Sequence, residues 1–161
     1  MKLNQQETDL ILETVMFYNS NNRGLRLLVK GDESPDHWAD AQCTYFDDTT
    51  RRTCAVGRCL TDEGRATFAK IELEYHGSSV AIVHNRMKAN DEDFYSHFLP
   101  QYRDVSVAVF KDLQLLHDNA CSWSPEGISE HGLETVGNMF GHDIKNMAVE
   151  ALKAKKHEAH N

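Results

Sequence analysis

The sequence predicts an α+β fold: a mainly helical single domain with a small antiparallel sheet. Apolar residues recur at helical spacing near the N-terminus and through the last third of the chain. Runs typical of strands are few and short. They do not alternate regularly with the helices, so a doubly wound parallel sheet is not expected. The chain has 161 residues, enough for one hydrophobic core, and we assign residues 1–161 to a single domain of roughly four or five helices.

The first helix is expected to follow Asn4, whose side chain can cap it, with Glu7 completing a capping box. An apolar stripe at helical spacing comes next, formed by Leu10, Ile11, Val15 and Tyr18. Polar residues at 19–22 end this helix. The apolar run 23–30 fits either a helix or a strand.

Two stretches have the residue types of a hairpin. Residues 43–46 and 52–56 are predicted to be its extended arms, around the polar turn 47–50. Residues 80–83, Val-Ala-Ile-Val, form the most strand-like tetrapeptide in the chain.

Helices are expected in the other regular segments. Residues 57–60 are predicted to open a short helix, and Thr-Asp-Glu begins the next one over 61–73. Apolar stripes predict a helix over 104–119. The Ser-Pro-Glu sequence, with proline at the first helical position, predicts another over 124–141. The last helix is expected at about 143–156.

Charge and hydropathy exclude several classes of protein. Lys and Arg number 17 against 25 Asp and Glu, a net charge of −8, which argues against direct nucleic-acid binding. An acidic surface can instead occupy a basic groove on another protein. No membrane partner is expected, because no segment approaches the roughly 20 apolar residues of a membrane helix. Acidic residues interrupt the N-terminal apolar run, so it is not a signal peptide, and we expect a cytoplasmic protein with reduced cysteines.

Cys54 is the first candidate for chemistry. It lies among three arginines just before a predicted helix, and both a helix dipole and nearby cations favour a thiolate. His117 would be its base and Asp118 the orienting carboxylate. Neighbouring residues on a helix point about 100° apart, so Asp118 is not expected to orient His117. Small residues follow Cys54 at 55–57, so we favour a buried, structural thiol.

A metal site is not predicted from the cysteines. Cys43, Cys54 and Cys59, with His37 or His117 as a further ligand, have the spacing C-x10-C-x4-C. No pair forms the C-x2-C clip that closes most structural zinc sites. Gly-rich phosphate loops are absent as well, and no cofactor is expected.

The sequence LQLLHDNA resembles the centre of the HD-type metal phosphohydrolases, which have an adjacent His-Asp pair on a helix. The resemblance implies that His84 or His97, together with Asp143, would complete the metal shell. The glycine usual after the pair is missing, as is the arginine usual before the first histidine.

Three blocks resemble another family. They are Cys43-x-Tyr45, then Cys54-Ala55-Val56-Gly57 with Leu60, then Leu113-Gln114-x-x-His117-Asp118 with Trp123. They are similar to a family of uncharacterised small proteins of phages and prophages, over about residues 40–125. The resemblance implies a setting rather than a mechanism: an accessory protein of a phage or mobile element in the bacterial cytosol. Gly64-Arg65 stands where the family tends to have an aromatic residue.

The three blocks are expected to form one local cluster. Gln114 and His117 lie three residues apart on one helix face, so both can point at the same place. That place is either a small polar pocket or a hydrogen-bonded core junction, and we favour the junction because buried polar groups are usually paired internally. The residues expected to bind a partner or ligand are Tyr45, Arg52, Arg58, Gln114 and Trp123.

The function expected from these observations is binding without catalysis, to a host or defence protein through an acidic surface. Three alternatives remain open at this point: a hydrolase or transferase that uses Cys54 and His117, a His-Asp metal phosphohydrolase, and a protein that sequesters a small nucleotide.

Overall fold

The computed structural model describes residues 2–27, 41–74 and 79–159, without the side chains of residues 25–27 and 41–43. The described part is a mainly helical α+β domain, as predicted. Its α-helices are α1 (Gln5–Phe17), α2 (Asp62–Glu74), α3 (Val80–Ala89), α4 (Val107–Asp118), α5 (Glu130–Phe140) and α6 (His142–Ala159). The same described residues include the 3-10 turns η2 (Gly57–Cys59), η3 (Phe94–His97), η4 (Pro100–Tyr102) and η5 (Ala120–Ser122). The strands are β1 (Leu25–Leu27), β2 (Ala41–Cys43), β3 (Trp123–Ser124) and β4 (Gly127–Ile128).

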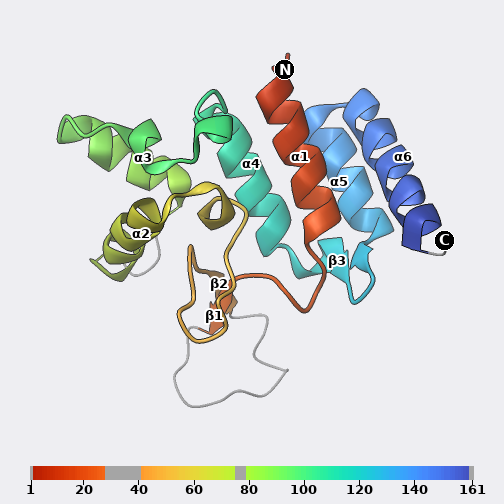
Figure 1. Ribbon diagram of the computed structural model, residues 1–161, viewed down its shortest axis with the longest axis horizontal. Helices are drawn as coiled ribbons and strands as arrows, with labels where there is room; N and C mark the ends of the chain where they lie inside the picture. The colour runs from red at the N-terminus through yellow and green to blue at the C-terminus, as the bar shows by residue number, and fades with distance from the viewer. Residues whose placement is uncertain (1, 28–40, 75–78, 160–161) are drawn as a thin grey trace.

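Helix α4 lies at the centre of the molecule (Figure 1). Helices α1, α5 and α6 pack together on one side of α4, and α2 and α3 lie on the other side. Both predicted stripes of α4 are buried, including Val109, Phe110, Leu113 and Leu116. The Phe110 ring stacks on Phe98, with 4.7 Å between ring centroids. None of the helices in the described part of the chain is long and apolar enough to span a bilayer.

The start of α1 is the one the sequence predicts. The Glu7 amide donates to Asn4 Oδ1 at 2.8 Å, and the Asn4 amide donates to Glu7 Oε1 at 3.3 Å. This capping box satisfies amides that would have no partner within the helix. The predicted stripe of α1 is buried, and its residues Leu10, Ile11, Val15 and Tyr18 are at most 1% exposed.

The predicted hairpin of residues 43–46 and 52–56 is wrong as a pair of strands. The strands are instead β1 and β2, which pair antiparallel with Leu25 opposite Cys43; residues 28–30 of the predicted run lie outside the described residues. The two predicted arms do run side by side, since the Cys54 amide donates to the Thr44 carbonyl at 3.1 Å. They do not form a ladder because the Thr44 amide donates to Gly24, and because η2 begins directly after residue 56.

Two further elements differ from the prediction. Residues 80–83 are the first turn of α3, capped by Ser79, because Val80, Val83 and Met87 are buried together at helical spacing. Packing therefore overrides the strand propensity of these residues. Residues 124–126 belong to the β3–β4 hairpin, and α5 begins only at Glu130, where Ser129 Oγ accepts from the Gly132 amide. The described residues contain six α-helices, more than the four or five expected.

Candidate functional site

Cys54 lies in the loop between Thr44 and η2 and is fully buried, with 0% exposure. Its Sγ accepts a hydrogen bond from the Gly57 amide at 3.3 Å. A Cβ added to Gly57 would lie 1.8 Å from the Tyr45 carbonyl oxygen, so only glycine allows this approach of the two chain segments. The small residues after Cys54 thus serve close packing, and the thiol has no path to solvent.

His117 occupies the last turn of α4 and is also fully buried. The Gly24 amide donates to His117 Nε2 at 3.2 Å, and His117 Nδ1 lies 2.9 Å from Asp118 Oδ1. Because Nε2 accepts, the ring proton is on Nδ1 and is donated to Asp118. Burial lowers the pKa of His117 below its ordinary value, against the opposing effect of Asp118, so the neutral ring is the stable form.

The contact between His117 and Asp118 corrects the sequence prediction that neighbouring residues on a helix could not pair. The two side chains meet at the end of α4 although they leave the helix in different directions. Asp118 is 38% exposed, so this carboxylate remains partly in water.

Other side chains fix the end of α4 around His117. Trp123 Nε1 donates to the Leu116 carbonyl at 3.0 Å, and Arg23 Nη1 donates to the His117 carbonyl at 2.8 Å. Both carbonyls belong to the last turn, whose oxygens have no partner within the helix. The Tyr18 ring meets His117 edge to face, with centroids 4.8 Å apart. We call the buried set of Tyr18, Gly24, Cys54, His117 and Trp123 the core junction.

Gln114 and His117 do not point at one place, contrary to the prediction. The Gln114 side-chain oxygen accepts from the Val80 amide, the first residue of α3, at 3.1 Å. His117 instead receives the amide of Gly24. Each side chain joins α4 to a different element, so the two residues are buried connections rather than the walls of a pocket.

Tyr45 is buried as well, with 1% exposure. Its amide donates to Glu72 Oε2 at 3.1 Å, and its ring packs edge to face on Phe68. These contacts join the loop after β2 to α2. Of the five residues predicted to bind a partner, Tyr45, Gln114 and Trp123 therefore have structural contacts.

The two arginines predicted to bind lie elsewhere. Arg58 Nη2 is 3.4 Å from Glu13 Oε2, and its guanidinium lies over the Phe17 ring at 5.0 Å. Arg58 thereby ties η2 to α1. Arg52 is exposed beyond the turn. The five predicted binding residues do not form one site.

The described residues contain no group of three or more His, Cys, Asp or Glu side chains placed to hold a metal ion. His84 lies on α3 and Asp143 on α6, and these two helices lie on opposite sides of α4 (Figure 1). His97, the alternative upstream histidine, lies in η3, and with either histidine the shell implied by the HD-type resemblance is not assembled within the described residues. His37 and the Cys43 side chain lie outside the described residues.

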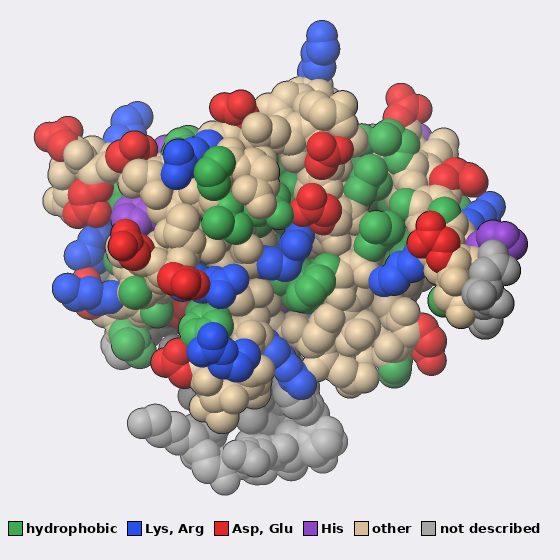
Figure 2. Space-filling view, in the orientation of Figure 1, with side chains coloured by type: hydrophobic (Ala, Val, Ile, Leu, Met, Phe, Trp, Pro, Cys, Tyr) green, Lys and Arg blue, Asp and Glu red, His purple; other side chains and the backbone are tan. Residues whose placement is uncertain are grey.

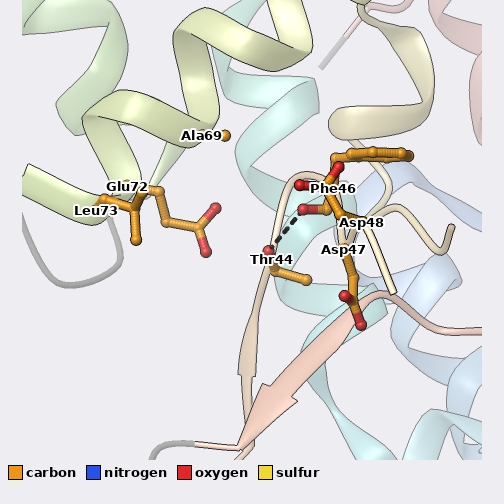
Figure 3. A pocket seen from close by; sticks show the side chains of 7 residues that line it. All are labelled: Thr44, Phe46, Asp47, Asp48, Ala69, Glu72 and Leu73. Carbon is orange, nitrogen blue, oxygen red and sulfur yellow. Dashed lines mark hydrogen bonds between the residues drawn. The ribbon is translucent and has the colours of Figure 1, made fainter. Parts of the chain in front are cut away.

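The surface has a hollow that the sequence did not predict, between α2 and the turn at residues 44–51. Figure 3 shows this acidic hollow, of about 280 Å³, lined by Thr44, Phe46, Asp47, Asp48, Ala69, Glu72 and Leu73. The Glu72 carboxylate reaches from α2 toward the turn, while Asp47 points away from α2 (Figure 3). The carboxylates therefore do not converge on one point.

A second hollow adjoins the first across Phe46 and Ala69. We call it the arginine hollow; it measures about 370 Å³ and is lined by Phe46, Asp48, Arg51, Asp62, Arg65, Ala66 and Ala69. The guanidinium carbons of Arg51 and Arg65 lie 4.9 and 5.3 Å from the centre of the Phe46 ring. In the sequence Phe46 precedes both arginines, by 5 and 19 residues, so no local motif could have located this hollow.

Comparison of the chain with protein-family models, curated proteins and solved structures finds no match.

Proposed function

We propose that the protein acts by binding another protein, a host or defence protein of a bacterial cell, and that Cys54, His117 and Asp118 do not perform catalysis. One observation carries the proposal: His117 is fully buried with both ring nitrogens hydrogen-bonded inside the chain. A general base must come within hydrogen-bond reach of a substrate proton. A nucleophilic thiol likewise needs an open approach, and Cys54 is 0% exposed.

The net charge of −8 supports a partner with a basic groove. Acidic and basic side chains are interspersed on the face seen in Figure 2, so this face does not present a continuous acidic surface. Asp91 and Glu92, which follow α3, are both exposed, and neither side chain makes an ion pair with a described residue. They are acidic positions at which the charge can be changed without breaking an ion pair with a described residue.

The resemblance to small phage and prophage proteins supports the same setting, an accessory factor in the bacterial cytosol. A hydrolase or transferase would require the core junction to open before Cys54 met a substrate. A metal phosphohydrolase would require His84 or His97 to meet Asp143 beside His117 and Asp118, and the described residues hold no such group of ligands. Binding requires neither change.

The test is capture from bacterial lysate followed by titration of the purified partner. We expect saturable binding that weakens as salt rises from about 0.05 to 0.5 M, because salt screens exposed charges. The double substitution Asp91→Asn with Glu92→Lys should weaken binding several-fold. Asn is chosen because Asp91 has a φ of 53°, which asparagine tolerates.

Lys111→Gln is the matched control, since Lys111 is exposed on α4 and its loss makes the chain more acidic. It should leave the affinity unchanged or raise it. The proposal is wrong if no saturable partner is captured, or if salt and the acidic double substitution both leave the affinity unchanged.

A further inference from the structure

The arginine hollow has a floor of small side chains. Ala66 and Ala69 lie three residues apart on α2, so they share one face of this helix. Larger side chains at these two positions would fill the space. The opening of about 370 Å³ lies within the range of small-molecule sites, roughly 300–1,000 Å³.

Arg65 is held in place at this hollow. Its Nε donates to the Gly57 carbonyl at 3.1 Å, and its Nη1 lies 3.9 Å from Asp62 Oδ1. Only 26% of its side chain is exposed. Because its position is already fixed, Arg65 would lose little conformational freedom on binding an anion.

Arg51 is placed at the hollow by an unusual backbone. Its φ is +62°, in the left-handed region that residues with a Cβ rarely adopt. The turn enforces this conformation, since the Arg51 amide donates to the Asp47 carbonyl and the Asp47 amide donates to the Arg52 carbonyl. Strained residues of this kind concentrate at ligand sites.

The Arg51 guanidinium forms no ion pair or hydrogen bond with any described residue. Among the described residues it makes a cation–π contact with the Phe46 ring. A chain of net charge −8 thus keeps an unpaired cation at a hollow that already holds Arg65. Arginine forks match the oxygens of phosphate, and guanidinium planes and aromatic rings both stack on bases.

Asp48 and Asp62 also line the hollow, and ionised carboxylates can only accept hydrogen bonds. The occupant must therefore offer both anionic oxygens and neutral donors. A nucleoside phosphate has both, since the phosphate faces arginine while the hydroxyls of the sugar and the N–H groups of the base face the carboxylates. We propose that the arginine hollow binds a nucleoside phosphate, independently of the protein partner proposed above.

Isothermal titration calorimetry of the full chain with adenosine 5′-monophosphate tests the proposal, with adenosine and inorganic phosphate as separate titrants. We expect the monophosphate to bind more tightly than either part alone. Arg51→Gly should weaken binding by about tenfold or more, the size of one lost charge-assisted hydrogen bond. Glycine accepts the positive φ without strain, so this variant should keep or raise the melting temperature.

Lys70→Ala is the matched control, because it removes one exposed cation from the same helix away from the hollow. It should change the affinity by less than about twofold. The proposal is overturned if the monophosphate does not bind, if phosphate alone binds as tightly, or if Lys70→Ala and Arg51→Gly weaken binding equally. Capture of the protein partner is unaffected by any of these results, so failure of this site and failure of protein binding are separable.

Discussion

Replacing His117 by alanine should destabilise the fold, because the imidazole is a buried connection between α4 and Gly24. The substitution leaves the Gly24 amide buried without its acceptor. It also removes the edge-to-face contact with Tyr18, whose ring centroid lies 4.8 Å away. A fully buried ring is replaced by a methyl group, and a cavity remains.

The magnitude follows from these contacts. A buried donor without a partner costs about 1–3 kcal/mol, and an aromatic pair contributes about 0.5–1.5 kcal/mol. Truncation of a buried side chain of this size costs roughly 2–5 kcal/mol. These contributions overlap, so we expect the free energy of unfolding to fall by about 3–4 kcal/mol.

Urea unfolding at pH 8, followed by tryptophan fluorescence, measures this change as a shift of the midpoint at constant slope. His117→Gln is the control, since a glutamine oxygen can accept from the Gly24 amide; it should cost about 1–2 kcal/mol less than alanine. A loss below about 1 kcal/mol for His117→Ala, or equal losses for both variants, would refute the role assigned to this ring.

Three other outcomes are expected. In thermal melts, Gly57→Ala should cost more than about 3 kcal/mol or prevent folding, because its Cβ would lie 1.8 Å from the Tyr45 carbonyl oxygen. Gly137→Ala should be neutral or stabilising, because its Cβ would meet only the side chains of Lys145 and His142, at 3.2 Å or more. Because the pKa of His117 is lowered in the folded state, the unfolded chain binds a proton there at a higher pH than the folded chain does. The free energy of unfolding, measured by urea titration, should therefore fall as the pH drops below about 6.5. The fall should be less steep in His117→Gln. Cys54→Ser should lower the free energy of unfolding by about 1–2 kcal/mol, and Cys54→Ala should lower it less. The biological effect should follow stability in both variants. Loss of that effect in Cys54→Ala at an unchanged melting temperature would show that the thiol takes part in chemistry.

The sequence predicts the elements whose signals are local. Asn4 and Glu7 are three residues apart, and the buried stripe of α1 repeats within two turns, so both are readable without knowledge of the fold. The fold class was also predictable, because helical periodicity covers most of the chain. The strand predicted at residues 80–83 is wrong. Burial of these residues against other elements, which the sequence does not show, stabilises a helix despite their β-branched side chains.

The core junction was predictable only in part. Gln114 and His117 are each hydrogen-bonded to a buried backbone amide, but they bind different elements instead of meeting at the one place that was expected. The partner of His117 was not predictable, because Gly24 lies 93 residues away in the sequence. The arginine hollow was missed for a related reason: the left-handed φ that directs Arg51 toward Phe46 arises from the closure of its turn.

The rate at which Cys54 reacts in the folded protein tests the structural role of the core junction most directly. Cys121 is exposed, while Cys54 is fully buried, so the chain contains its own reference thiol. Iodoacetamide labelling at neutral pH, with peptides resolved by mass spectrometry, should modify Cys121 rapidly. Cys54 should react at least about a thousandfold more slowly, because labelling requires an opening that costs a large part of the roughly 5–15 kcal/mol of global stability. Labelling of Cys54 as fast as Cys121 in protein that remains folded would contradict this role and indicate a reactive, accessible thiol.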